Sequence, residues 1–250
     1  MVNVIECGPY KLEMSGRTLI MGILNMTPDS FSDGGRYNAV DTALERARQL
    51  IQDGADIIDV GGESTRPGYE QISSEEEIER VVPIIECLAQ EVNVPISIDT
   101  YKADVARAAL KAGAHIINDI WGAKADPDMA KVAADTGVPI ILMHNREAKP
   151  YQDFMRDALN DLYESIQLVK GAGVKDEQII LDPGIGFAKT LEENLLMMRN
   201  LRIITSLGYP VLLGTSRKSM IGHTLQLPVE ERVEGTIASV CLGIQQGCSI

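Results

Sequence analysis

Positive charge is scarce in this sequence of 250 residues. There are 23 Lys and Arg residues against 36 Asp and Glu residues, so the formal net charge is -13. A chain with this balance has no long-range positive field, which argues against nucleic acid or an anionic membrane as a partner. A small anionic substrate remains compatible with it, because a few arginines, backbone amides or a metal ion can hold one.

Cysteine pairs and long apolar runs are absent as well. The four cysteines are scattered, none forms a CxxC pair, and no His stands at metal-ligand spacing from them, so buried, reduced thiols are expected at Cys7, Cys87, Cys241 and Cys248. No apolar run reaches the ~18 residues of a membrane span, and the first residues lack the basic and apolar regions of a signal peptide. These features predict a soluble, cytoplasmic protein.

The glycine-rich fingerprints of nucleotide-binding proteins are also missing, since neither GxGxxG after the first strand nor GxxxxGK[ST] occurs. The sequence instead repeats one pattern, in which a short apolar segment is followed by a polar loop and an amphipathic helix. Near-continuous apolar strands that alternate with helices indicate a buried parallel sheet. Seven such strands are predicted, over residues 19–26, 56–62, 95–100, 115–120, 139–144, 179–185 and 210–216.

Seven βα units at regular spacing favour an α/β fold of the (β/α)8 TIM barrel type over a doubly wound sheet. An N-terminal β-hairpin is predicted from residues 10–14 and 17–22, around a turn at Ser15-Gly16. The chain ends at residues 247–250, where the eighth strand is expected to begin, so the last strand and helix are expected to be truncated. No linker or composition shift interrupts the chain, which predicts one domain over residues 1–250.

Polar residues stand where the predicted strands end. In a barrel, active sites gather at these ends, so separate strands are expected to bring them into one ring. Each alone has a simpler explanation, since Asp and Asn often cap the next helix and a single His is usually structural. Together they favour a site for a polar small molecule. The residues are Asn25, Asp59, Asp99, Asn118, His144, Asp182 and Thr215-Ser216, followed by Arg217-Lys218.

Two loops are long for a compact barrel, one over residues 27–38 and the other over residues 63–74. Both carry Gly and Pro together with Ser, Thr and one Arg each, and loops of this length tend to be binding loops. Thr65-Arg66 suits an anion, because the guanidinium presents a planar fork of donors.

The segments MGILNMTPDSFSDGG, DVGGESTRPG, SIDT, IINDI, DPGIGF and GTSRKSMIG, in this order and spacing, closely resemble the dihydropteroate synthase family of folate biosynthesis. The resemblance spans nearly the whole chain and implies a pterin-binding (β/α)8 barrel, usually a homodimer. It implies a transferase that joins 6-hydroxymethyl-7,8-dihydropterin diphosphate to p-aminobenzoate with Mg2+. The products are 7,8-dihydropteroate and pyrophosphate, and sulfonamides compete at the p-aminobenzoate position.

The resemblance also implies roles for the pterin side of the site. Asp182 is expected to accept from the 2-amino group and N3–H, Asn118 to match the amino group and N1, and Lys218 to reach the carbonyl. Asp99 is expected to accept from N8–H and to favour positive charge on the departing pterin methylene, with Asp59 beside it as an acceptor. Met143 and Phe187 are assigned to the ring faces, with ordinary core packing nearly as good an explanation.

For the other substrates, the resemblance assigns Asn25 to the metal ion and the diphosphate, and Thr65 and Arg66 to phosphate oxygens. The catalytic set is then Asp99, Arg66 and Lys218. The loop residues expected to close around p-aminobenzoate are Phe31, Asp33, Pro67 and Ser219.

One departure from the family is visible, because the chain ends before the Arg-x-His motif that the family carries on its last strand. Two alternatives therefore stay open beside the synthase. One is a pterin-dependent methyltransferase that acts with a corrinoid partner, against which the TPDSFSDGG loop and SRKS argue. The other is a pterin-binding fragment with impaired catalysis.

Overall fold

A six-stranded parallel sheet forms the centre of the structure. The computed structural model describes residues 4–26, 35–63, 71–147 and 150–250, with the backbone alone for 35–38. Each strand pairs with the next one along the chain, which is the order of a TIM barrel and confirms the predicted fold. The strands are β3 (Met21–Asn25), β4 (Ile57–Gly61), β5 (Ile96–Asp99), β6 (Ile116–Asp119), β7 (Ile140–Met143) and β8 (Ile179–Asp182).

Short backbone segments continue the ring beyond β8. Val211 pairs with Leu181 in parallel, at the position of the predicted seventh strand. Ser249 N–H donates to the Val211 carbonyl at 2.9 Å, and Leu19 N–H donates to the Ser249 carbonyl at 2.9 Å. Ser249 therefore occupies the eighth position of the barrel and joins the seventh segment to the residues that lead into β3.

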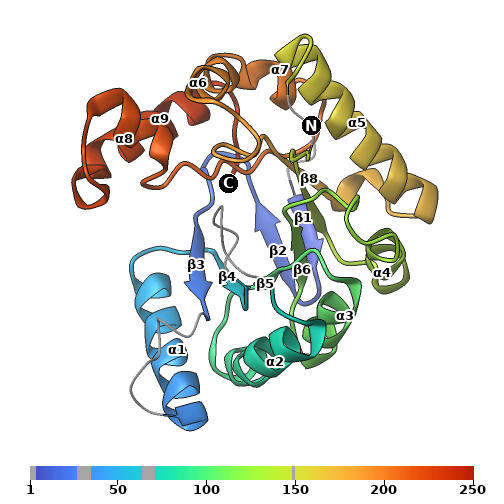
Figure 1. The fold of residues 1–250 in the computed structure, drawn as a ribbon. Helices are drawn as coiled ribbons and strands as arrows, with labels where there is room; N and C mark the ends of the chain where they lie inside the picture. Colours follow the sequence, from blue (N-terminus) through green and yellow to red (C-terminus); the bar gives the residue numbers. More distant parts are fainter. Residues whose placement is uncertain (1–3, 27–34, 64–70, 148–149) are drawn as a thin grey trace.

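Helices surround the strands, and α8 and α9 pack together at one side (Figure 1). The Ser73 side chain caps α2 by accepting from Glu76 N–H, and Thr190 with Glu193 forms a capping box on α6. Left-handed glycines end α3, α4 and α5, as expected for helices that stop before a strand. The helices are α1 (Gly35–Gln52), α2 (Ser74–Glu91), α3 (Ala103–Ala112), α4 (Met129–Thr136), α5 (Phe154–Ala172), α6 (Leu191–Arg199), α7 (Leu201–Thr205), α8 (Ser219–Leu225) and α9 (Val233–Gln245), with 3-10 turns η2 (Asp176–Gln178) and η3 (Val229–Glu231).

The N-terminal hairpin exists, but the prediction placed it too late in the chain. Strand β1 (Val4–Cys7) pairs with β2 (Tyr10–Glu13) in antiparallel fashion, and the turn lies at Gly8-Pro9, where Gly8 has φ +61°. Ser15-Gly16 instead belongs to the connection into the barrel. The Gly-Pro turn supplies both a left-handed residue and a residue with fixed φ, which makes it the stronger turn signal.

The inner face of the barrel changes from apolar to polar along the strands. Successive side chains of a strand point to opposite faces, so Ile57 and Asp59 share one face, as do Ile116 and Asn118. The isoleucines form one layer with the hairpin, which closes this end of the barrel. Its buried members are Ile5, Cys7, Leu12, Leu19, Ile57, Ile116, Ile141, Ile180, Leu212 and Ile250. The next layer, toward the strand ends, carries the polar residues of the candidate site.

Candidate functional site at the carboxyl ends of the strands

Three carboxyl groups lie in the polar layer above the isoleucines. Asp59 and Asp182 are buried on β4 and β8, while Asp99 ends β5 and is partly buried. The Asn118 side-chain amide donates to Asp59 Oδ2 at 3.1 Å and so joins β6 to β4 across β5. Strand pairing sets Asp99 beside Asn118 and Met143 beside Asp182. The structure thus brings these five predicted residues to one edge of the sheet.

Burial dominates the charge state of these carboxyl groups. It raises the pKa of Asp59 to about 6, against the effect of the neighbouring Ser97 hydroxyl and of the hydrogen bond from the Asn118 amide. It also raises the pKa of Asp99 well above its usual range, and the negative charge of Asp59 adds to the effect. Within the described residues, Asp59 Oδ1, Asp99 Oδ1 and Ser97 Oγ are buried and have no hydrogen-bond partner. The site therefore presents buried acceptors that suit a ligand rich in N–H donors.

Lys218 supplies positive charge to the same layer. Burial lowers the pKa of its ammonium, while the carboxylates of Asp182 and Asp99 act in the opposite direction. Its Nζ donates to the Ile185 carbonyl and lies 4.5 Å from the centre of the Phe187 ring. Gly186 leaves room for this side chain, because a Cβ there would lie 3.0 Å from Lys218 Cδ.

The segment that carries Lys218 makes a sharp turn before α8. Arg217 has φ +52°, its N–H donates to Thr236 Oγ1 at 2.9 Å, and its carbonyl accepts from Arg232 at 3.0 Å. Both contacts anchor the turn to α9 and the residues just before it. Ser219, assigned to the p-aminobenzoate side, begins α8 and is exposed.

Two residues of the predicted ring point elsewhere. His144 follows the inward-facing Met143, so its side chain faces α5, where Nε2 lies 3.0 Å from Asp161 Oδ2. Thr215 is buried and accepts a hydrogen bond from Ser239 of α9 at 3.0 Å. The prediction that one ring gathers all the polar strand ends was wrong for both, because neighbouring residues alternate between the inside and the helix layer.

The remaining predicted residues are less fully described. Asn25 ends β3 and is exposed. Its Oδ1 and Asp99 Oδ2 lie 3.6 and 3.4 Å from the position that a Cβ on Gly61 would take. The predicted residues that lie outside the described part of the chain are Phe31, Asp33, Thr65, Arg66 and Pro67.

A buried charge network that the sequence reasoning missed lies beside the end of β4. Lys102 Nζ is 2.7 Å from Glu63 Oε2, Glu77 Oε2 and the Ile72 carbonyl. Glu63 also accepts from Ile72 N–H at 3.1 Å and from the Tyr101 hydroxyl at 2.9 Å. One ammonium thus joins residues 63 and 72, both of the second long loop. The only signal in the sequence was a lone lysine after SIDT.

The comparisons with known proteins agree with this arrangement. The family model "Pterin binding enzyme" matches residues 21–250. A dihydropteroate synthase of Bacillus subtilis is 61% identical over 248 residues, which cover 99% of this chain and 87% of that protein. The chain belongs to the dihydropteroate synthase family of pterin-binding enzymes. The prediction of a transferase of this family is confirmed.

Two solved dihydropteroate synthases show the same fold. The enzyme of Clostridium difficile, solved in the presence of pteroic acid, superposes with a TM-score of 0.91 at 50% identity, covering 94% of this chain and 90% of that one. The Yersinia pestis enzyme, in complex with a sulfonamide drug, gives a TM-score of 0.91 at 41% identity, with 99% and 92% covered. Both relatives are named dihydropteroate synthases, and neither is named a corrinoid methyltransferase.

The buried Asp59 carboxyl predicts a stability cost that depends on pH. Its pKa is about 6 in the folded chain and about 3.9 in an unfolded one, so between these values the folded state binds more protons and the free energy of unfolding falls as pH rises. Asp59→Asn removes the titrating carboxyl group and with it this loss of stability at higher pH. Its gain over the parent should be larger at pH 8 than at pH 5, by about 1 kcal/mol, because roughly one pH unit between the folded and unfolded pKa values lies above pH 5.

Urea denaturation of parent and variant at both pH values measures this difference. Asp135→Asn on the exposed part of α4 is the matched control and should show no such dependence. A gain from Asp59→Asn that is equal at the two pH values would contradict the assignment of a raised pKa to this carboxyl.

Proposed function

We propose that this chain condenses 6-hydroxymethyl-7,8-dihydropterin diphosphate with p-aminobenzoate to give 7,8-dihydropteroate and pyrophosphate. Membership of the family supports the reaction class. The observation that carries the assignment to this site is the set of buried acceptors at the barrel mouth, on Asp59 and Asp99, beside Asp182 and Lys218. A reduced pterin offers an amino group and ring N–H groups along its edges, which are the donors that such acceptors need.

In the proposed complex, Asp182 accepts from the 2-amino group and N3–H, and Asn118 pairs with the amino group and N1. Lys218 donates to the ring carbonyl, and Asp99 accepts from N8–H. Lys218 Nζ lies 4.5 Å from the centre of the Phe187 ring, which supports the proposal that both residues line one side of the pterin site. Met143 is buried on the strand next to Asp182. Asp59 acts through Asn118, whose amide it already accepts from.

The chemistry proposed here is a displacement at the pterin methylene carbon. The amine nitrogen of p-aminobenzoate forms a bond to that carbon as its bond to the diphosphate oxygen breaks. The electron pair leaves with the diphosphate, and the amine loses its proton to solvent. Fixed negative charge from Asp99 favours the positive charge that develops on the pterin, and a neutral amine needs no strong base.

For the diphosphate we propose Asn25, Thr65 and Arg66, and for p-aminobenzoate Phe31, Asp33, Pro67 and Ser219. Mg2+ fits the Asn25 end of the site, since Asn25 Oδ1 and Asp99 Oδ2 both lie beside Gly61 and Mg2+ accepts one or two protein oxygens while it keeps several waters. When bound there, it neutralises charge on the leaving diphosphate. Among the described residues no group of three or more His, Cys, Asp or Glu has the geometry of a metal site.

The fold and the cysteines support two further proposals. We propose that residues 1–250 act as one pterin-binding domain, because the hairpin and the residues around Ser249 complete the same barrel. A cytoplasmic location suits the four cysteines, all of which are free. The prediction that they are buried holds for Cys7 and Cys248 and was wrong for Cys241, which is exposed on α9, while Cys87 is partly buried. In the described part of the chain no helix is long and apolar enough to cross a membrane.

Pyrophosphate release by the 250-residue chain tests the proposed reaction directly. With dihydropterin diphosphate, p-aminobenzoate and Mg2+ we expect release that depends on all three and that a sulfonamide suppresses. A folded chain that binds the pterin but releases no pyrophosphate would contradict the proposal that it catalyses the reaction and would favour the pterin-binding fragment.

The role of Asp182 predicts a loss of pterin affinity in Asp182→Ala. A hydrogen bond to a charged group contributes about 1.5–3 kcal/mol, so the pterin dissociation constant should rise roughly 10- to 150-fold. Isothermal titration calorimetry measures this change, with Asp135→Ala as an exposed control. Unchanged affinity in Asp182→Ala would remove Asp182 from the proposed pterin contacts.

A homodimer is also proposed, through one face of α9. Val233, Ile237, Cys241 and Ile244 are exposed at the spacing of a single helix face, and only Ser239 and Gly243 of this helix are buried. An apolar stripe of this kind suits a second copy of the chain.

The dimer is tested by light scattering of the parent and of Ile237→Asp. We expect a parent dimer that the charged variant converts to monomer, because burying an unpaired carboxylate is costly. Leu168→Asp, at another exposed apolar position on α5, should leave the dimer unchanged. A parent that is monomeric at micromolar concentration would overturn the proposal.

A further inference from the structure

A second lysine, Lys189, follows just after the segment 182–187, which carries Asp182 and Phe187. It is 8% exposed. Its Nζ donates to the Gly184 carbonyl at 2.7 Å and to the Phe187 carbonyl at 2.9 Å, and the His144 carbonyl lies 3.5 Å away. One ammonium has three N–H donors, and here they serve backbone carbonyls of two neighbouring strand-end segments.

The backbone of this segment explains why several carbonyls point toward one place. Gly184, Gly186 and Ala188 all have positive φ, at +66°, +87° and +47°. Gly184 also lies against the end of β7, because a Cβ there would be 2.1 Å from the His144 carbonyl oxygen. Converging carbonyl dipoles create a region of negative potential, which a buried cation stabilises.

Gly184 and His144, whose carbonyls contact Lys189 Nζ, also donate hydrogen bonds to Asp182. Gly184 N–H donates to Asp182 Oδ1 at 2.7 Å, and His144 N–H donates to the Asp182 carbonyl at 2.8 Å. Lys189 therefore binds the carbonyl oxygens of Gly184 and His144, while the N–H groups of the same two residues hold the side chain and the backbone of Asp182.

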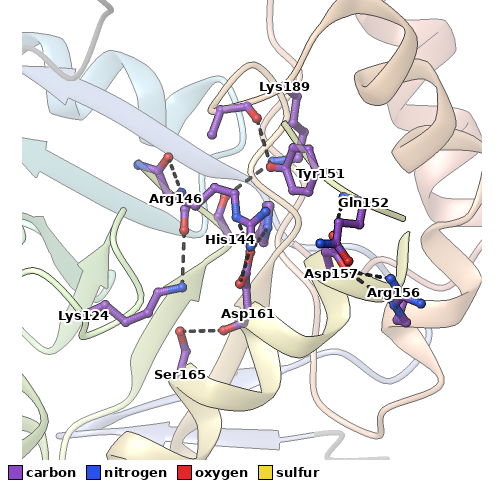
Figure 2. Close-up of polar contacts among 12 residues, drawn as sticks. Lys124, His144, Arg146, Tyr151, Gln152, Arg156, Asp157, Asp161, Ser165 and Lys189 are labelled. Carbon is purple, nitrogen blue, oxygen red and sulfur yellow. Dashed lines mark hydrogen bonds and ion pairs between the residues drawn. The ribbon is translucent and has the colours of Figure 1, made fainter. Parts of the chain in front are cut away.

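Polar contacts link the residues around Lys189 to one another (Figure 2). The Tyr151 hydroxyl donates to the Ala188 carbonyl at 2.9 Å, and the Arg146 guanidinium stacks over the Tyr151 ring at 4.5 Å. Asp161 binds both Arg146 and the His144 ring. This cluster supports the backbone of His144 and Ala188, next to the carbonyls that Lys189 holds.

We propose that Lys189 is a positioning residue that sets the geometry of Asp182 for pterin binding. The proposal rests on the proposed function, since it assumes that Asp182 binds the pterin. Lys218 holds the same segment from the opposite side, through the Ile185 carbonyl and the Phe187 ring. Lys218 is proposed to donate to the ligand, whereas the described contacts of Lys189 Nζ are to the His144, Gly184 and Phe187 carbonyls.

The charge of Lys189 gives this role a second consequence. Burial raises the pKa of Asp182, and the positive charges of Lys218 and Lys189 oppose that rise, together with the Gly184 N–H. Three other titratable groups are coupled to these: Asp99, which acts on Lys218, the Cys248 thiol, whose pKa Asp182 raises, and the His144 ring, whose pKa burial and then the Lys189 charge lower. Loss of the Lys189 charge should therefore let Asp182 take up a proton at a higher pH.

Two variants separate the hydrogen bonds of Lys189 from its charge. Lys189→Met removes both, and Lys189→Gln keeps N–H donors without the charge. We expect the dissociation constant of dihydropterin diphosphate to rise about tenfold in Lys189→Met and less in Lys189→Gln at pH 8. The acidic limb of the binding profile should move to higher pH in both. Calorimetry from pH 5 to 8 measures these quantities, and Lys131→Met, on the exposed face of α4, is the control.

Steady-state kinetics distinguishes positioning from general damage. The KM for the pterin substrate should rise in both variants, while the KM for p-aminobenzoate stays near that of the parent. If Lys189→Met fails to fold, Lys189→Gln alone decides, through the shift of its acidic limb. Parent-like affinity and an unshifted profile in a folded variant would overturn the role of Lys189. If the parent itself binds no pterin, the proposed function fails first.

Discussion

Desolvation of carboxyl groups is the constraint on which the rest of this site depends. Asp59, Asp99 and Asp182 sit directly above a layer of isoleucines that the N-terminal hairpin closes from below, so water has no access from that end of the barrel. Burial consequently raises the pKa of all three groups. Water would supply hydrogen bonds to these carboxylates if they were exposed. In the buried site, their ionised form becomes more stable when a ligand brings N–H donors or positive charge into the same space. The apolar layer is therefore part of the recognition of the pterin.

The same constraint explains why cations hold the surrounding loops. Lys102 joins residues of the second long loop to α2 by binding Glu63, Glu77 and the Ile72 carbonyl, and Lys189 gathers the carbonyls of Gly184 and Phe187. In each case the ammonium stabilises buried backbone oxygens, and at Lys102 it stabilises buried carboxylates as well. Such contacts cost desolvation, but they leave few alternative conformations for the segments that carry the ligand-binding groups.

Periodicity in the sequence was enough to predict the barrel and most of its polar layer, because a parallel strand that is buried on both faces reads as a short apolar run. It was not enough to decide which strand-end residue points inward. His144 was grouped with Asp182 although it follows the inward-facing Met143 and so faces α5. The hairpin was misplaced because Ser15-Gly16 was preferred to Gly8-Pro9 as the turn. Lys189 was missed because the convergence of carbonyls on it depends on three positive φ angles, which the letters GIGFAK do not reveal.

The two lysines near Asp182, which come from different loops, show how one residue type serves two purposes around the segment 184–187. With all groups ionised, three carboxylates and two ammonium groups leave this part of the site with one negative charge in excess. A neutral, donor-rich ring can enter without a counterion, and the excess charge favours the transition state in which the pterin methylene becomes electron-poor. Lys218 is the lysine proposed to donate to that ring, whereas Lys189 Nζ donates to the Gly184 and Phe187 carbonyls. Because Lys189 holds the backbone of residues 184–187, we expect Asp182 to keep its orientation while Lys218 moves from the Ile185 carbonyl to the ligand.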